Sequence, residues 1–147
     1  MLINQIDQDL IEAMKEKDES RTSVLRMLKS ALHNWQIANK KEPTDADVLT
    51  VIQKEIKSRK DSVELFKQGN RVELASKEEG EIGLLEKYLP EQASEAKIRL
   101  KVQEIIKNIN ANSIQDMGKV MGPVMAEFKG KADGSLVSQI VKKELTK

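Results

Sequence analysis

A short basic turn near the end of the sequence has residue types that suit anion binding. It runs Lys129-Gly130-Lys131-Ala132-Asp133-Gly134, between two stretches with helical periodicity. Gly130 can adopt the left-handed conformation that ends one helix, and Asp133 is a favourable N-cap for the next. Lys129 and Lys131 would then lie beside the N–H groups that a helix start leaves free. We expect a phosphate-like anion there, although Asp133 opposes one and many such turns only connect helices.

A second group of basic residues is expected on one long helix. At helical spacing, four cations fall within about a quarter of the circumference, namely Lys57, Lys60, Lys67 and Arg71. Glu64 lies among them, so a phosphate-facing surface and an ordinary solvated face explain the pattern equally well. The predicted nucleic-acid-binding residues are Lys57, Lys60, Arg71, Lys129 and Lys131. They could form one surface if the linker at Pro90 folds the two halves of the chain together.

No arrangement of residues in the sequence suits catalysis. His33 is the only histidine, and nothing nearby would orient it, so an exposed helical histidine is expected. Glu78, Glu79 and Glu81 could exchange protons, but a solvated acidic face explains them better. There is no cysteine, no cluster of metal-ligand spacing and no phosphate-binding glycine loop. We therefore predict no catalytic residue, no metal and no cofactor.

The composition is typical of solvated helices around an aliphatic core. Hydrophobic residues make up 39% of the chain, charged residues 33% and aromatic residues 3%. Scarce aromatic residues disfavour RNA recognition by stacking on rings. The absence of cysteine fits a reducing compartment, and no segment reaches the roughly 18–20 apolar residues of a membrane span. We expect a soluble, cytoplasmic monomer with no membrane partner.

The net charge is only +1, but the charges are segregated along the chain. Residues 1–20 hold six acids and two bases (net −4), and residues 21–60 hold four acids and nine bases (net +5). Residues 73–95 hold seven acids and two bases (net −5), and residues 96–147 hold five acids and ten bases (net +5). This segregation could give a basic face, or it could let oppositely charged helices pack side by side.

Apolar periodicity predicts seven helices and no strand. They are expected at about 2–14, 20–38, 44–68, 71–88, 94–108, 113–128 and 133–147. Thr44 with Asp47, and Ser113 with Asp116, match the capping-box pattern, and Ser94 is a further N-cap. The predicted fold is all-α and multihelical. It consists of a helical N-terminal subdomain, 1–90, and a small three-helix C-terminal subdomain, 94–147.

Three residues inside the expected helices carry their own predictions. Arg59 falls in the apolar stripe of the third helix, so it should link the subdomains or pair with an acid. Gly80 and Gly83 each cost roughly 1 kcal/mol relative to alanine in a helix, so they should mark close packing or a bend.

The sixth expected helix is rich in methionine. Its methionines could form an adaptable binding groove, but core packing is the favoured interpretation. Its two glycines, one turn apart, should let a neighbouring helix approach closely, and Pro123 should kink the helix or start a new turn. The residues concerned are Met117, Met121, Met125, Gly118 and Gly122.

Four motifs, in order along the chain, resemble the YqeY-like family. They are LRMLKSALHN (25–34), QKEIKSRKDSVELFKQGNR (53–71), LLEKYLPEQ (84–92), and MGKVMGPVM followed by KGKADGSLVSQIV in the last 31 residues. The resemblance covers nearly the whole chain. This family is related to the C-terminal tail domain of the B subunit of aspartyl/glutamyl-tRNA amidotransferase, which commonly has proline where this chain has Gly134.

The resemblance implies a role connected with tRNA, because the related tail helps to hold the tRNA body. The chain lacks room for the other amidotransferase domains, so it should not amidate anything alone. We expect a tRNA-binding accessory protein, with tRNA as its partner. One alternative is a factor that supports glutamine-dependent carbon–nitrogen ligase chemistry only with a partner amidotransferase or aminoacyl-tRNA synthetase. The other is a helical protein–protein adaptor with no nucleic-acid role.

Overall fold

The computed structural model describes residues 1–147 and is helical throughout, with seven α-helices, one 3-10 helix and no strand. The predicted all-α fold is therefore confirmed. The chain divides into two compact units, Met1–Leu89 and Pro90–Lys147, and each has its own hydrophobic core. None of the helices combines the length and the apolar character that a membrane crossing requires.

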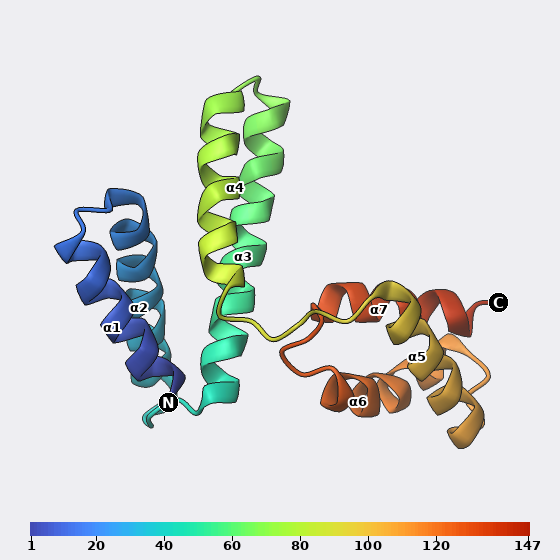
Figure 1. The fold of residues 1–147 in the computed structure, drawn as a ribbon. Coiled ribbons are helices and arrows are strands. Elements are labelled where there is room, and N and C mark those ends of the chain that lie inside the picture. The colour runs from blue at the N-terminus through green and yellow to red at the C-terminus, as the bar shows by residue number, and fades with distance from the viewer. The chain divides into compact units, whose positions relative to one another are not determined.

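The N-terminal unit consists of two helical hairpins (Figure 1). The first pairs α1 (Leu2–Lys15) with α2 (Glu19–Asn39), and the second pairs α3 (Asp45–Gln68) with α4 (Val72–Glu86). Aliphatic side chains from all four helices are buried together, among them Ile6, Leu28, Ile52 and Leu85. The core thus lies along the stripes that the 3.6-residue periodicity indicates.

Local signals explain where the helices of this unit begin and end. Thr44 and Asp47 form the predicted capping box at the start of α3, with both reciprocal bonds present. Asp18 caps α2 by accepting a hydrogen bond from the backbone N–H of Arg21. Lys40 follows α2 in the left-handed conformation, with a φ of 54°. This conformation ends the helix and turns the backbone into the loop.

The second hairpin is joined by a buried ionic cluster. Arg59 of α3, only 7% exposed, donates hydrogen bonds to Glu81 and Glu78 of α4 and contacts the sulfur of Met27 of α2. The prediction that Arg59 pairs with an acid is confirmed. The predicted solvated acidic face is wrong at Glu81, which is 6% exposed, because pairing with Arg59 lets this carboxylate be buried.

The glycines of α4 do not mark close packing. A Cβ atom added at Gly80 or at Gly83 would meet nothing within 4 Å, and both residues are exposed. The expected close packing is therefore wrong at these positions, since no neighbouring helix requires the absence of a side chain.

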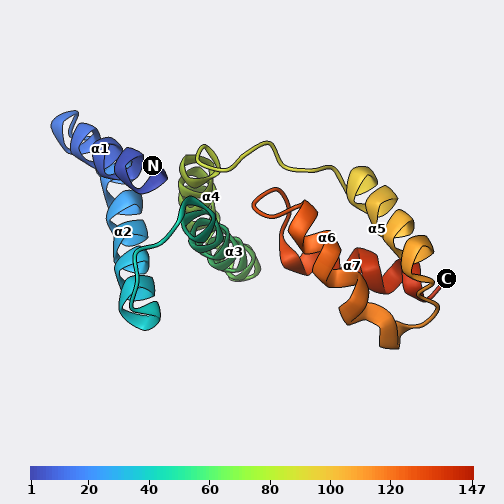
Figure 2. The same cartoon turned by 90° about the horizontal axis from the view of Figure 1, so that it is seen from below.

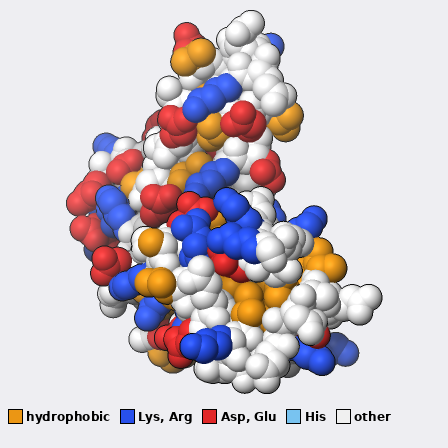
Figure 3. Space-filling model, turned by 90° about the vertical axis from the view of Figure 1, so that its right-hand side faces the viewer, with side chains coloured by type: hydrophobic (Ala, Val, Ile, Leu, Met, Phe, Trp, Pro, Cys, Tyr) orange, Lys and Arg blue, Asp and Glu red, His pale blue; other side chains and the backbone are white.

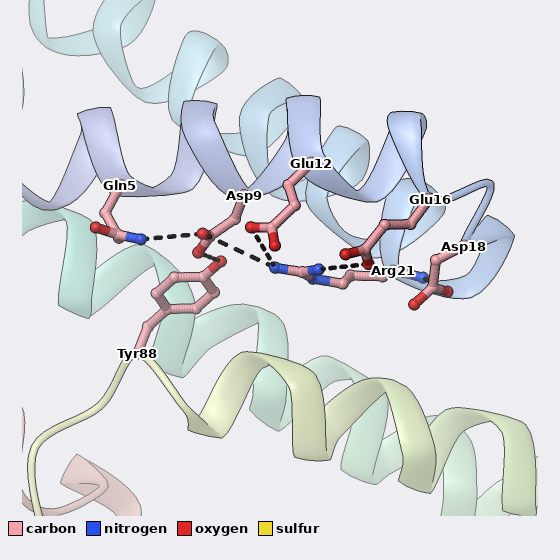
Figure 4. A network of polar contacts seen from close by, with 7 residues as sticks. All are labelled: Gln5, Asp9, Glu12, Glu16, Asp18, Arg21 and Tyr88. Carbon is pink, nitrogen blue, oxygen red and sulfur yellow. Dashed lines mark hydrogen bonds and ion pairs between the residues drawn. The ribbon is translucent and has the colours of Figure 1, made fainter.

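A polar network ties the end of α4 to the first hairpin (Figure 4). The Tyr88 hydroxyl donates a hydrogen bond to a carboxylate oxygen of Asp9 on α1. Arg21 of α2 lies 3.7–3.8 Å from Asp9, Glu12 and Glu16. Burial raises the pKa of Tyr88, and the hydrogen bond to Asp9 and the charge of that carboxylate raise it further. The tyrosine therefore stays protonated as a donor to Asp9.

The C-terminal unit is a bundle of three helices, each in contact with the other two (Figure 2). They are α5 (Glu95–Ile109), α6 (Met117–Glu127) and α7 (Gly134–Leu145), with the 3-10 helix η1 (Ile114–Asp116) before α6. Fully buried aliphatic side chains of all three helices form the core, among them Ile98, Val102, Val120, Val124 and Val137. No charged residue of this unit is buried as a whole, although the side chain of Glu144 is only 5% exposed.

The methionine-rich helix follows only part of its prediction. Its three methionines are partly buried and pack against the core, as the favoured interpretation holds. Its two glycines, Gly118 and Gly122, are exposed, and an added Cβ would meet nothing within 4 Å, so the expected close helix approach is wrong. The helix continues through Pro123 rather than starting a new turn there. Ser113 makes no side-chain cap, and Asp116 instead accepts from the N–H of Asn112.

Candidate anion-binding groove

The basic turn between α6 and α7 has the predicted backbone conformation. Gly130 has a φ of 76°, in the left-handed region, and the N–H groups of Lys131 and Ala132 both donate to the carbonyl oxygen of Phe128. Asp133 caps α7 by accepting a hydrogen bond of 3.2 Å from the N–H of Ser135. The carboxylate that was expected to oppose an anion is therefore engaged by the start of its own helix.

The segment that precedes α5 is bound to this turn. The N–H of Ala93 donates to the carbonyl oxygen of Lys131 at 2.8 Å. The side-chain amide of Gln92 donates to the carbonyl oxygens of Gly130 at 3.0 Å and Pro90 at 2.8 Å. These contacts hold the turn beside the first turns of α5, where Ser94 accepts from the N–H of Lys97 as the predicted N-cap.

A groove of about 610 Å³ lies between the start of α5 and the turn. Three lysines line it, Lys97 and Lys101 from α5 and Lys131 from the turn. Three acids, Glu91, Glu104 and Glu127, lie around the same groove, together with Leu100 and Phe128. Its size falls in the range of roughly 300–1,000 Å³ that small ligands occupy in proteins.

The lysines of the groove differ in whether a carboxylate neutralises them. Lys101 lies 3.6 Å from Glu104, one turn away on the same helix. Lys97 and Lys131 make no ion pair within the protein. The groove therefore offers two cations without a protein counter-ion, and their charges are free to meet an external anion.

Another face of α5 makes polar contacts with α7. Glu144 of α7 accepts from Gln103 and Lys147 and lies 3.6 Å from Arg99. Burial alone would raise the pKa of Glu144, but the hydrogen bonds from Lys147 and Gln103 and the nearby positive charges lower it. Arg99 therefore binds α7, while Lys97 and Lys101 remain with the groove.

The predicted site residues fall in both units. Lys131 lines the groove, whereas Lys129 is exposed but does not line it. Lys57 and Lys60 are exposed on α3, and Arg71 is exposed at the start of α4. The fourth cation of that arc, Lys67, is engaged in an ion pair of 3.0 Å with Glu79. Figure 3 shows acidic as well as basic side chains on the molecular surface.

Sequence reasoning missed three residues of the groove, Lys97, Leu100 and Lys101. The four-residue spacing of the two lysines, directly after the Ser94 cap, would have indicated one helix face. No sequence signal indicates that Lys131 comes to lie beside them. That proximity depends on the hydrogen bonds from residues 92 and 93 to the turn.

Comparison with known proteins defines the class of this helical protein. The chain matches the family described as Yqey-like protein over residues 3–145, and it belongs to that family. An uncharacterised protein of Schizosaccharomyces pombe is 38% identical over 89 residues, which cover 60% of this chain and 72% of that protein. The protein named "Altered inheritance of mitochondria protein 41, mitochondrial" is 31% identical in Lachancea thermotolerans, over 97% of this chain and 80% of that protein. The protein of the same name in Pyrenophora tritici-repentis is 29% identical, over 95% and 78%.

These relatives correct the expected cytoplasmic location. Two relatives that cover nearly the whole chain are named as mitochondrial proteins, which contradicts the cytoplasmic expectation. The cytoplasmic prediction was based on the absence of cysteine, and this feature does not distinguish one reducing compartment from another.

Proposed function

We propose that this protein is a tRNA-binding accessory protein that holds phosphates of the tRNA in the groove of its C-terminal unit. The observation that carries the proposal is the pair of cations, Lys97 and Lys131, which face one groove and have no carboxylate partner. Lysines without protein counter-ions suit phosphates, because no ion pair within the protein has to be broken for binding. Binding also releases counter-ions from the nucleic acid, which favours the complex.

The backbone around these lysines also favours an anion. The first turn of α5 borders the groove, and a helix start carries a partial positive charge and free N–H groups. Lys57, Lys60 and Arg71 of the N-terminal unit, with Lys129 in the C-terminal unit, complete the proposed set of phosphate contacts. The charge segregation of the sequence, with net +5 over residues 96–147, supports the same assignment.

Binding to total tRNA with a salt titration tests the proposal. We expect modest affinity, with the logarithm of affinity falling linearly with the logarithm of salt concentration. Changing Lys97 and Lys131 together to Gln should weaken binding by about tenfold and reduce the salt slope by roughly 1.5 units. The matched control changes Lys107 and Lys142 to Gln, because both are exposed in the same unit and do not line the groove. This control should alter the affinity and the salt slope much less.

A wild-type affinity for tRNA no greater than for a neutral polymer at low salt would remove the proposal. Equal losses in the groove variant and the control variant would leave tRNA binding in place but remove the groove as its site. Circular dichroism of each variant, compared with the wild type, shows whether a loss of binding reflects unfolding instead.

The two alternatives make different predictions. A factor that acts with an amidotransferase or a tRNA synthetase should bind that enzyme in the presence of tRNA and stimulate its turnover. The adaptor alternative needs a docking surface, and the methionines of α6, which could have formed a binding groove, instead pack against the core. No specific observation therefore favours the adaptor.

A further inference from the structure

We propose that the groove receives an unpaired nucleotide, with its phosphate on the lysines and one base face on Leu100, rather than the backbone of a continuous duplex. This inference rests on the proposed RNA-binding function and specifies which part of an RNA enters the site. It follows from the mixed lining of the groove, which combines cations with apolar side chains.

Leu100 is the residue that a purely electrostatic site does not explain. Its side chain is 66% exposed, and it does not belong to the hydrophobic core of the unit. It lies on α5 between Lys97 and Lys101 and lines the same groove. Phe128, a core residue with 8% exposure, reaches the groove as a second apolar surface. A large exposed leucine beside two cations without protein partners suits a ligand that is apolar on one side and anionic on the other.

An unpaired nucleotide has this combination, and a duplex does not. In an A-form helix the base faces are stacked inside, and the accessible surface consists of phosphates, 2′-hydroxyls and base edges. Leu100 would gain nothing apolar from such a surface. A nucleotide in a loop or bulge exposes a base face that can be buried against an aliphatic side chain, while its phosphate remains within reach of Lys97 and Lys131.

The acids of the groove are compatible with a base edge but would repel a phosphate placed beside them. Glu91 and Glu127 line the groove, and neither makes an ion pair within the protein. A carboxylate repels phosphate, but it can accept hydrogen bonds from amino groups on a base edge. The groove thus has cationic, apolar and hydrogen-bond-accepting surfaces, one for each part of a nucleotide.

The test compares two RNA probes with equal numbers of phosphates, a hairpin with an unpaired loop and a blunt continuous duplex. The wild type should bind the hairpin more tightly. Leu100→Ser should weaken hairpin binding by about fivefold and leave duplex binding unchanged, since only the hairpin can bury apolar area on Leu100. Ile109→Ser is the matched control, because Ile109 is 42% exposed on the same helix and does not line the groove.

Each result distinguishes this inference from the proposed function. Equal effects of Leu100→Ser on both probes, or no effect on either, would overturn the inference while tRNA binding stands. Failure of the wild type to bind either RNA would overturn the proposed function and the inference together. Tighter binding of an acidic peptide with apolar residues than of the hairpin would assign the groove to a protein partner and also overturn the inference. A preference for the hairpin that is lost in Leu100→Ser and kept in Ile109→Ser supports it.

Discussion

The two units place their charged residues differently. In the N-terminal unit, Arg59 and Glu81 are buried between helices, and Arg21 lies 3.7–3.8 Å from three carboxylates, two on α1 and one at its C-cap. In the C-terminal unit, the buried residues are all apolar, the one nearly enclosed carboxylate side chain, that of Glu144, is held by exposed partners, and the lysines that border the groove lie at the surface. Both units are helical and have aliphatic cores, so the difference lies in how the charges are used.

This comparison separates cations that hold a structure together from cations that can bind a ligand. A buried ion pair fixes which helix faces meet, because any other register would leave a charge without its partner. Surface lysines around an aliphatic core are not needed to fix how the helices pack. Lys97 and Lys131 are of this kind, and they lack a protein partner. Net positive charge in a segment is therefore weaker evidence for a binding surface than the absence of a partner at particular cations.

The largest expected effect comes from breaking the buried pair. Arg59→Ala leaves Glu81 buried without its cation and should lower the free energy of unfolding by about 3–5 kcal/mol, measured by urea denaturation. Arg99→Ala is the counterpart in the C-terminal unit. It removes a partly exposed pair with Glu144 and should cost less than about 1 kcal/mol.

A double variant sharpens this prediction. Arg59→Met with Glu81→Leu replaces both charges by apolar groups and should recover most of the stability that Arg59→Ala loses. If Arg59→Ala is as stable as the wild type, Glu81 reaches solvent without its partner. The two units then do not differ in how strongly their stability depends on an ion pair.

The second effect concerns pH and Tyr88, the only tyrosine in the chain. Its pKa is raised in the folded protein, so the unfolded chain loses the phenolic proton first as pH rises. The contribution of Tyr88 to stability should be complete below about pH 10, the ordinary tyrosine pKa, and should fall as pH rises above it. Denaturation of the wild type and of Tyr88→Phe across this range measures the difference, which should shrink with increasing pH.

Absorbance of the phenolate gives an independent check. The single tyrosine of the folded protein should titrate at higher pH than that of the urea-unfolded chain. Titration at the same pH in both states would contradict the hydrogen bond to Asp9.

A smaller effect should be the same in both units. Gly80→Ala in α4 and Gly118→Ala in α6 should each raise the free energy of unfolding by up to about 1 kcal/mol, because the new methyl group meets no neighbour and alanine favours the helix. Thermal denaturation of the two variants measures this. Destabilisation at either position would show that a neighbouring surface contacts the glycine.

The smallest expected effect is that of separating the units. We propose that the subdomains expected from the sequence fold independently, since each unit has its own core. A fragment of residues 90–147 should keep helical circular dichroism and a cooperative thermal transition. A fragment without such a transition would show that the C-terminal unit depends on the N-terminal one.

The sequence by itself determined the helices, because their signals are local. Apolar side chains recur at helical spacing, and Thr44, Ser94 and Asp133 have the chemistry of N-caps that accept backbone N–H groups nearby. The left-handed Gly130 follows from the same local reasoning. The motifs that indicate the family are also contiguous strings, so the whole-chain comparison agrees with them.

Only the tertiary structure decided which charged residues are buried and which surround the groove. Glu78, Glu79 and Glu81 look alike in sequence, yet Glu81 is buried and Glu78 half-buried beside Arg59, whereas Glu79 is exposed. Lys131 lies 30 residues or more from Lys97 and Lys101, and hydrogen bonds from Gln92 and Ala93 bring the three together. Helix periodicity indicates which side of each helix is apolar. The partners of a charge depend on contacts between segments far apart in the chain, which a local pattern does not contain.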